Sequence, residues 1–460
     1  MSIEYQPHQQ RVIDKVNNPG GPHGIIAYHS LGSGKTLTAL GAFDKALAGN
    51  PKDRGLFVVP ASLVENVYKE IDKHKLNHLR DRLDVMSYER ATNNFHKLCL
   101  NKYRLAAFDE AHRLRNSNTK RVNRLNNVIE NSDKVLMLTG TAGYNHPSDM
   151  TSLINLINPK EKAPTTHAEF EKAYIDTDRW ELKNKDKLKR LLNKYIDQYQ
   201  TPTDSKDFPT VTRVVKEIEM SPRQTKLYRL LERDIPREIR SKLQNNLPMS
   251  LKDTTALNVF AQGVRQASDS PMHHDLSATY KDRPKVMAAA NSMITKAQST
   301  PGFRGVVYSN YLDAGIKPYR EALEDAGIKP LVFTGGLTQK AKKELVDEYN
   351  SKSKKPKVLI LSSSGSEGLD LKNTQLMQLL EPHFNKSKLK QAEGRAIRYK
   401  SHESLPQNKR NVLVEEYRST LPRTRWQRFW GMQGDAAIDG YLAQASDRKQ
   451  GIIDSINSML

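Results

Sequence analysis

The chain has 460 residues, more than one hydrophobic core usually organises, so we expect two or three domains. Its 73 Lys and Arg residues against 52 Asp and Glu residues leave a formal net charge of +21, which favours a polyanionic partner such as nucleic acid over a merely soluble basic surface. A single cysteine, Cys99, excludes an intrachain disulfide and a cysteine-rich metal site. Because the sequence has no signal peptide and no long apolar span, we expect a soluble, intracellular protein without membrane contact.

The first predicted strand and helix enclose a glycine-containing loop. Residues 24–28 (GIIAY) are typical of a short buried strand, and residues 36–49 have the period of an amphipathic helix. The loop HSLGSGKT (residues 29–36) meets the phosphate-loop pattern except at His29, where the pattern has glycine. Such a loop brings backbone N–H groups and the positive end of a helix to one point, which favours phosphate binding over a plain turn.

The residue types of this loop suit a nucleotide. Gly32 and Gly34 permit a tight curve, Lys35 can neutralise the outer phosphates, and the Thr36 hydroxyl can ligate magnesium.

Further apolar runs at residues 56–59, 105–108 and 135–138 alternate with helical patterns and predict a parallel sheet covered on both faces. Such sheets bind ligands at the carboxyl ends of their strands. Asp109 and Glu110 of the segment DEAH occupy that position, where one carboxylate can hold Mg²⁺ through water and the other can polarise the attacking water. Two acids after a strand are alone more typical of an ordinary loop, but together with the phosphate loop they indicate a catalytic pair.

After Pro159 the pattern becomes lysine-rich and helical. Residues 179–199 predict one basic helix whose apolar stripe consists of Leu188, Leu191, Leu192, Tyr195 and Ile196. A second helical block runs from residue 221 to about 267. Strand patterns then return at residues 305–308, 331–333, 358–361, 376–380 and 412–414. They predict a second α/β layer.

The second half contains an arginine segment, QAEGRAIRYKSH (residues 391–402). Arg395 and Arg398 are three residues apart, so we expect them to share one helix face. Guanidinium groups that meet a triphosphate from a second lobe would stabilise charge in the transition state. A solvated helix face is the alternative.

The tail RTRWQRFW (residues 423–430) combines arginine with Trp426, Phe429 and Trp430. We expect these aromatic side chains to pack a terminal helix on the core, and stacking on bases is the alternative. Residues 439–456 then predict a closing helix that braces the lobes.

These segments resemble, in order and over nearly the whole chain, the motifs of superfamily 2 helicase-type motors of the Swi/Snf-like group. YQPHQ, with Gln9, is similar to the adenine-contacting glutamine motif, and HSLGSGKT and DEAH stand at motifs I and II. The other matches are residues 58–71 (motif Ia), 86–89 (Ib), 138–159 (III), 220–228 (the crossing between lobes), 306–310 (IV), 365–372 (V) and 391–402 (VI).

Some segments are closer to the ATPases of large DNA viruses and related phage proteins. They are residues 207–209, 365–372, 379–385 and 394–406. Motif V lacks the double glycine and asparagine usual in cellular remodellers, so the resemblance does not imply nucleosome remodelling.

The resemblance implies an α/β protein of two RecA-like lobes, each a parallel sheet flanked by helices, with helical insertions and a C-terminal bracing helix. We expect an N-terminal ATP-binding lobe at residues 1–218, with a helical insertion at about 160–205. We expect a C-terminal helicase lobe at residues 219–460, with an insertion at about 224–290.

The resemblance also implies site residues, with ATP and Mg²⁺ as cofactors. The catalytic residues are Lys35, Asp109, Glu110, Gln391, Arg395 and Arg398. The ATP-binding residues are Gln9, Gly32, Ser33, Gly34, Lys35, Thr36, His112, Gly368 and Asp370, and the Mg²⁺ residues are Thr36 and Asp109. By position, the residues that contact nucleic-acid phosphates are Ser62, Tyr88, Ser309, Thr334, Gly335 and Ser363, each of which could instead cap a helix or form a turn.

The implied function is an ATP hydrolase that couples hydrolysis to translocation on duplex DNA, with remodelling or unwinding of forked or branched DNA. Two alternatives stay open: a viral or phage transcription-associated DNA-dependent ATPase, and a nucleic-acid clamp that uses ATP only as a switch. We expect a monomer that works with viral or phage replication or transcription partners in the host cytoplasm or nucleoid. The sequence motifs predict a nucleic-acid ligand and do not specify whether it is DNA or RNA.

Overall fold

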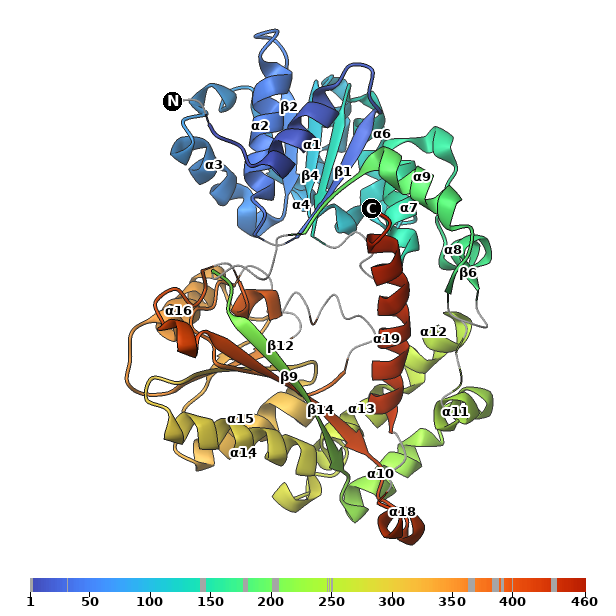
Figure 1. The fold of residues 1–460 in the computed structure, drawn as a ribbon, viewed down its shortest axis with the longest axis vertical. Helices are drawn as coiled ribbons and strands as arrows, with labels where there is room; N and C mark the ends of the chain where they lie inside the picture. Colours follow the sequence, from blue (N-terminus) through green and yellow to red (C-terminus); the bar gives the residue numbers. More distant parts are fainter. Residues whose placement is uncertain are drawn as a thin grey trace. The chain divides into compact units, whose positions relative to one another are not determined.

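The computed structural model describes residues 3–30, 32–140, 146–176, 181–200, 207–245, 247, 249, 251–362, 369–382, 389, 393–398, 400–431 and 437–460. The chain forms two compact units, Met1–Pro202 with Lys449–Leu460, and Thr203–Arg448. Each unit contains a six-stranded parallel sheet with helices packed on it, as Figure 1 shows. The expected α/β class with two parallel sheets is therefore confirmed.

The sheet of the first unit has the strand order β3-β2-β4-β5-β1-β8. Its strands are β1 (Gly24–His29), β2 (Gly55–Val59), β3 (Leu83–Ser87), β4 (Leu105–Asp109), β5 (Val135–Thr139) and β8 (Ile196–Tyr199). Strands β2, β4 and β5 are buried along their whole length, which explains why they form continuous apolar runs in the sequence. Outside this sheet, β6 (Ile175–Asp176) and β7 (Glu181–Leu182) form a short antiparallel pair.

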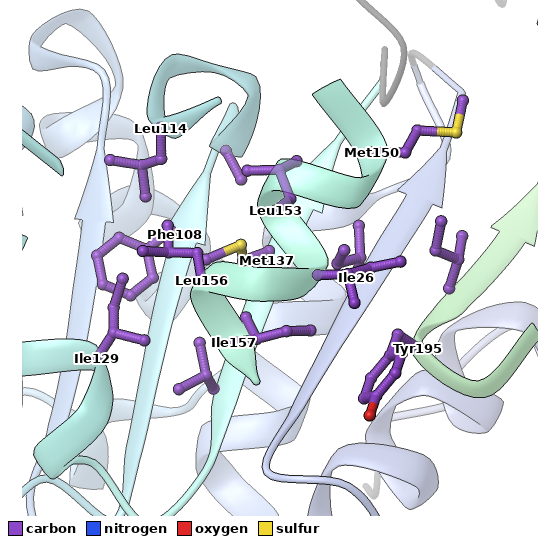
Figure 2. Packing of buried hydrophobic residues seen from close by; sticks show 14 of the residues in the cluster. Ile26, Phe108, Leu114, Ile129, Met137, Met150, Leu153, Leu156, Ile157 and Tyr195 are labelled. Carbon is purple, nitrogen blue, oxygen red and sulfur yellow. The ribbon is translucent and has the colours of Figure 1, made fainter. Parts of the chain in front are cut away.

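Helices cover both faces of this sheet. On one face are α1 (Pro7–Asn17), α2 (Lys35–Leu47) and α3 (Val64–Lys73). On the other are α4 (Tyr88–Asn93), α5 (Phe95–Leu100), α6 (Lys120–Asn131), α7 (Ser148–Ile157), α8 (His167–Tyr174) and α9 (Lys185–Tyr195). Figure 2 shows the second face, where Ile26, Phe108 and Met137 of three strands lie beside Leu153 and Ile157 of α7.

The prediction of one basic helix over residues 179–199 is wrong at both ends, because Glu181–Leu182 form β7 and helix α9 begins only at Lys185. Helix α9 stops at Tyr195, and Leu188, Leu192 and Tyr195 form its buried stripe. Ile196 begins strand β8 instead, where it pairs with Ile26 of β1 at the edge of the sheet. Tertiary pairing thus overrides a helical pattern that the sequence continues through this point.

The sheet of the second unit has the order β11-β12-β10-β13-β14-β9. Its strands are β9 (Thr210–Glu219), β10 (Arg304–Ser309), β11 (Leu331–Phe333), β12 (Lys357–Ser362), β13 (Leu376–Leu379) and β14 (Asn411–Thr420). Helices α14 (Pro284–Ser299) and α15 (Lys317–Asp325) cover one face, and α16 (Gln339–Asn350) packs on the other.

A separate helical layer completes the second unit. It consists of α10 (Pro222–Glu232), α11 (Arg237–Gln244), α12 (Leu251–Phe260), α13 (Gln262–Asp269) and the first turns of α19 (Ile438–Asn457). Within the described part of the chain, no helix combines the length and apolar composition that crossing a membrane requires.

The boundary between the two units lies after Pro202, whereas we expected it between residues 218 and 219. The reason is that β9 pairs along its whole length with β14 and so belongs to the second sheet. The end of α19 belongs to the first unit, where Ile452 and Ile456 enter the core. The expected C-terminal helix is therefore present, and it contributes side chains to the cores of both units.

Candidate functional site

Three neighbouring strands bring the predicted ATP residues of the first unit to one sheet edge. The order β4-β5-β1 places Asp109, Thr139 and the loop after His29 at adjacent carboxyl ends. This edge is where a doubly covered parallel sheet binds its ligands.

The loop after β1 has the backbone that its glycines predict. Gly32 and Gly34 have φ values of +82° and +78°, a region that other residues rarely adopt. Gly34 is the N-cap of α2 and has no side chain to satisfy the first N–H groups of the helix. Lys35 Nζ donates to the carbonyl oxygens of His29 at 3.1 Å and Ser30 at 3.2 Å. The ammonium group therefore lies over the loop, where phosphate oxygens would offer it acceptors of higher charge.

Helix α1 holds this loop from one side. Gln9 Nε2 donates to the carbonyl oxygens of Ser33 at 3.2 Å and Gly34 at 3.4 Å, and His8 Nε2 lies 2.9 Å from the Ser33 oxygen. Gln9 Oε1 accepts the backbone N–H of Gln6 at 2.9 Å. The predicted adenine-contacting residue is thus also a direct link between α1 and the loop.

The acidic pair lies at the end of β4. The Asp109 carboxylate is buried and accepts the backbone N–H of Glu110 at 2.9 Å, and Tyr88 donates its hydroxyl to the Asp109 carbonyl oxygen at 2.7 Å. Burial, and then the charge of Glu110, raise the pKa of Asp109 to about 6 against the opposing effect of the Lys35 ammonium. Glu110 has a φ of +50°, which costs a non-glycine residue about 1 kcal/mol and is typical of functional turns.

His112 connects the acidic pair to the next strand. Its Nδ1 lies 3.3 Å from Glu110 Oε2 and 3.4 Å from the Thr139 hydroxyl at the end of β5. Thr139 is fully buried, so its hydroxyl contacts His112 and not solvent. Thr141, at the end of the same motif, lies outside the described residues.

The residues at this edge fit ATP with Mg²⁺. Ser33 Oγ is buried and has no hydrogen-bond partner among the described residues, and Asp109 is a desolvated carboxylate beside a single lysine. Across the described part of the chain, no cluster of three His, Cys, Asp or Glu residues forms a protein-only metal cage. Mg²⁺ does not require one, because it is usually held by one or two protein ligands, water and substrate phosphates. Thr36, which is half-buried in the first turn of α2, and Asp109 supply such a set.

Sequence reasoning missed a charged cluster behind the loop. Asp197 of β8 accepts two hydrogen bonds from Arg11, at 2.7 and 2.8 Å, and one from Lys15 at 2.7 Å. Its Oδ1 also lies 3.1 Å from Nε2 of the buried His29. Burial opposes ionisation of Asp197, but hydrogen bonds from His29, Arg11 and Lys15 prevail and hold its pKa well below the usual range. The sequence did not indicate this cluster, because Asp197 lies in residues 179–199, which were predicted to form a helix and not a strand.

In the second unit, motifs V and VI come together. Arg398 Nη1 lies 3.7 Å from Asp370 Oδ1, and the Arg395 carbonyl oxygen accepts the N–H of Leu371 at 3.1 Å. The helical residues described here are 393–396, so Arg398 lies beyond them and does not share a helix face with Arg395 as expected. Gly368 and Gln391 lie outside the described residues.

The predicted nucleic-acid contacts divide into exposed and buried groups. Ser62, in a 3-10 turn after β2, and Gly335, after β11, are exposed, and Thr334 is half-buried. Tyr88 is fully buried with its hydroxyl bonded to Asp109, and Ser309 is fully buried with its hydroxyl donated to Glu381 at 2.6 Å. The hydroxyls of these last two residues are therefore used inside the fold, and a phosphate contact through their backbone stays a prediction. Ser363 lies outside the described residues.

The expectation for the aromatic tail is also wrong. Helix α18 (Arg425–Phe429) leaves Trp426 72%, Phe429 79% and Trp430 60% exposed.

Comparisons with known proteins agree with this arrangement. The SNF2-related domain family matches residues 82–271, the helicase conserved C-terminal domain matches residues 285–400, and the res subunit of type III restriction enzymes matches residues 2–144. A protein of Acanthamoeba polyphaga mimivirus named as an ATP-dependent RNA helicase (L538) is 29% identical over 467 residues, which cover 100% of this chain and 97% of the relative. A termination factor NPH-I homolog of African swine fever virus is 24% identical over 491 residues, 85% of this chain and 68% of the relative.

A solved structure, the Sulfolobus solfataricus SWI2/SNF2 ATPase core in complex with dsDNA, matches with a TM-score of 0.41 and 18% identity. The match covers 91% of this chain and 89% of that chain.

Proposed function

We propose that the chain is an SNF2-related helicase that hydrolyses ATP to move along duplex DNA, because it combines a match to the SNF2-related domain family with a match to the helicase conserved C-terminal domain. The observation that carries the proposal is the placement of Lys35, Asp109 and Glu110 at the same carboxyl edge of one sheet, with only β5 between β1 and β4. A lysine over a glycine loop and two carboxylates at the same sheet edge are what phosphoryl transfer to water requires.

Each residue of this group has one role. The loop N–H groups and Lys35 bind the phosphates, and Thr36 and Asp109 hold Mg²⁺, which neutralises charge on the phosphate oxygens when bound. Glu110, which directly follows β4 and has a φ of +50°, orients the attacking water and takes up its proton. His112 transmits the position of Thr139 to Glu110 through its two short contacts.

Arg395 and Arg398 complete this site from the second unit when the units close on ATP. Their positive charges then stabilise the transition state, so hydrolysis depends on closure. Asp370 keeps Arg398 near the end of motif V until the nucleotide offers stronger acceptors. Closure is one equilibrium that ATP and nucleic acid both shift, and this coupling turns hydrolysis into movement.

Nucleic acid is held mainly through phosphates, because a translocating motor cannot depend on sequence. The net charge of +21 supports this, as do the exposed positions of Ser62 and Gly335 after strands of the two sheets. Affinity for DNA should fall steeply with rising salt. A flat salt dependence would contradict phosphate tracking.

A transcription-associated DNA-dependent ATPase is the second candidate. It is favoured by the similarity to a viral protein named as a termination factor homolog. The ATP-switched clamp is less well supported, because the hydrolytic carboxylates Asp109 and Glu110 are both present beside Lys35. We further propose that the chain acts as a monomer with viral or phage partners inside the host cell.

Phosphate release measured side by side with single-stranded DNA, duplex DNA, forked DNA and RNA tests the proposal. The duplex motor predicts the largest stimulation by duplex DNA, whereas a branch-processing helicase would respond most to forked DNA. A clamp would bind nucleic acid in an ATP-dependent manner without releasing phosphate. Lys35→Ala, which removes the phosphate-binding ammonium, is the control for contaminating hydrolases.

A further inference from the structure

We propose that helix α18 carries a second, separate binding site, which stacks on the unpaired bases of single-stranded nucleic acid. The site is the α18 aromatic patch, defined as Trp426, Phe429 and Trp430. The proposal rests on the proposed function only in taking nucleic acid as the partner of the chain.

The patch is an unusual concentration of exposed aromatic surface. Phenylalanine and tryptophan normally bury most of their surface, yet all three rings here are more than half exposed. The Trp426 and Trp430 ring centroids are 5.9 Å apart at an interplanar angle of 29°, and Phe429 meets Trp430 edge-on at 5.2 Å and 89°. The rings therefore form one continuous aromatic surface with faces open to a planar ligand.

The short helix is held in a defined orientation. A capping box closes its first turn: the Gln427 N–H donates to Thr424 Oγ1 at 3.2 Å, and the Thr424 N–H donates to Gln427 Oε1 at 2.8 Å. Arg423 and Arg428 both donate to Glu219 at the end of β9, at 3.3 and 3.1 Å. Figure 1 shows α18 beside this end of the β9–β14 pair. A fixed aromatic platform loses little conformational entropy when it binds.

The charge around the patch favours a polyanion. Arg423, Arg425 and Arg428 lie in the same short segment as the rings, and the carboxylate of Glu219, which pairs with Arg423 and Arg428, neutralises part of their charge. Arg425 is exposed and no ion pair is found for it among the described residues. Arginine beside exposed aromatic rings suits a strand whose phosphates and bases alternate.

Base stacking requires bases whose faces are free, so the ligand is single-stranded. In a duplex each base face is covered by its neighbours, and the patch could then meet only backbone. The α18 aromatic patch is thus suited to a displaced DNA strand or to a nascent RNA transcript. Both have unpaired bases, and they differ in the sugar, which is deoxyribose in one and ribose in the other.

Intrinsic fluorescence gives a direct test, because Trp426 and Trp430 are two of the three tryptophans in the chain. In a Trp180→Phe variant they are the only ones. We expect oligo(dT) or oligo(U) to quench the tryptophan fluorescence saturably. Both should quench it if the patch does not distinguish deoxyribose from ribose, and only one should if it does. In the otherwise unmodified chain, replacing all three patch residues by alanine should weaken binding of a labelled oligonucleotide by roughly tenfold or more.

Leu276→Ala is the matched control, since Leu276 is a 90% exposed apolar side chain of the same unit outside the patch. It should leave oligonucleotide affinity unchanged. Unchanged oligonucleotide affinity in the triple variant would overturn the proposal. So would a fluorescence response to anionic lipid vesicles, or to a protein partner, without any response to oligonucleotides.

Duplex binding and duplex-stimulated phosphate release by the unmodified chain separate this proposal from the proposed function. If both persist while the patch tests fail, only the α18 site is wrong. If no nucleic acid binds or stimulates the chain, the proposed function fails and the α18 site with it.

Discussion

His29 Nε2 lies 3.1 Å from Asp197 Oδ1, and this contact joins the phosphate loop to strand β8 across 168 residues of sequence. It explains how histidine can stand where phosphate loops have glycine. The His29 ring is fully buried and meets the rings of His8 and Tyr199 at centroid distances of 5.4 and 5.8 Å. Because Asp197 also holds Arg11 of α1, the loop, the glutamine motif and β8 form one connected assembly.

Asp197→Asn should loosen this assembly. The amide keeps the shape of the side chain but removes the negative charge of the Asp197 carboxylate, which His29, Arg11 and Lys15 all contact. Arg11 and Lys15 are 46% and 43% exposed and can be hydrated, so we expect a loss of about 1–3 kcal/mol in the free energy of unfolding. The KM for ATP should rise more than kcat falls, which urea titration and phosphate release will measure.

Asp14→Asn is the matched control for that variant. Asp14 lies on α1, the helix that also carries Arg11, and it pairs with Lys45, but both side chains are 51% exposed, so we expect a loss of less than about 0.5 kcal/mol in the free energy of unfolding. Equal stability of the two variants, with an unchanged KM for ATP, would show that Asp197 does not position the loop.

Asp109→Asn should stabilise the protein at neutral pH while abolishing hydrolysis. The folded pKa of Asp109, about 6, lies above the unfolded value of about 4, so its carboxylate opposes folding increasingly as pH rises between them. Removing the charge should therefore gain on the order of 3 kcal/mol above pH 6 without Mg²⁺, and little below pH 4. Urea unfolding at pH 4 and pH 7.5 measures the difference, and a variant that is less stable at pH 7.5 contradicts it.

Glu110→Gln should separate ATP binding from hydrolysis. The amide retains the size of the side chain but cannot accept a proton from water, so we expect hydrolysis to fall by at least about 100-fold with little change in nucleotide affinity. Nucleotide titration and phosphate release on the same sample measure the two effects. Normal turnover by this variant would remove Glu110 from its catalytic role.

Ile456→Ala should destabilise the first unit although the residue lies at the far end of the chain. Ile456 is 1% exposed within the core of that unit, so we expect a loss of about 2–4 kcal/mol. Hydrogen exchange should show faster exchange in β1 and α7 than in the second sheet. Ser455→Ala, at the adjacent exposed position, is the control, and equal exchange in both variants would contradict the assignment of this segment.

Local signals predicted the centre of each sheet and the ATP loop. Strands β2, β4 and β5 are buried on both faces and therefore form apolar runs in the sequence. The phosphate loop and the DEAH segment are each short, continuous motifs, so they can be found without knowledge of the fold. Strand β9 lacked such a signal, because most of its side chains are exposed at a sheet edge. The role of Asp197 depends on pairing across 168 residues, and no local period contains it.

Aromatic spacing was equally ambiguous. The same spacing suits a buried helix and the exposed α18 aromatic patch, and only the position of α18 beyond the sheet distinguishes them. Tyr88 and Ser309 show the reverse case, since their motifs suggested phosphate contacts but their hydroxyls are used inside the fold.

We propose that residues of both units act on one ATP molecule. The most direct measurement is duplex-stimulated phosphate release by an Arg395→Ala, Arg398→Ala double variant, together with its ATP affinity. We predict that stimulated hydrolysis falls by at least about 100-fold while ATP still binds the first unit. Full stimulated hydrolysis in this variant would contradict a shared site.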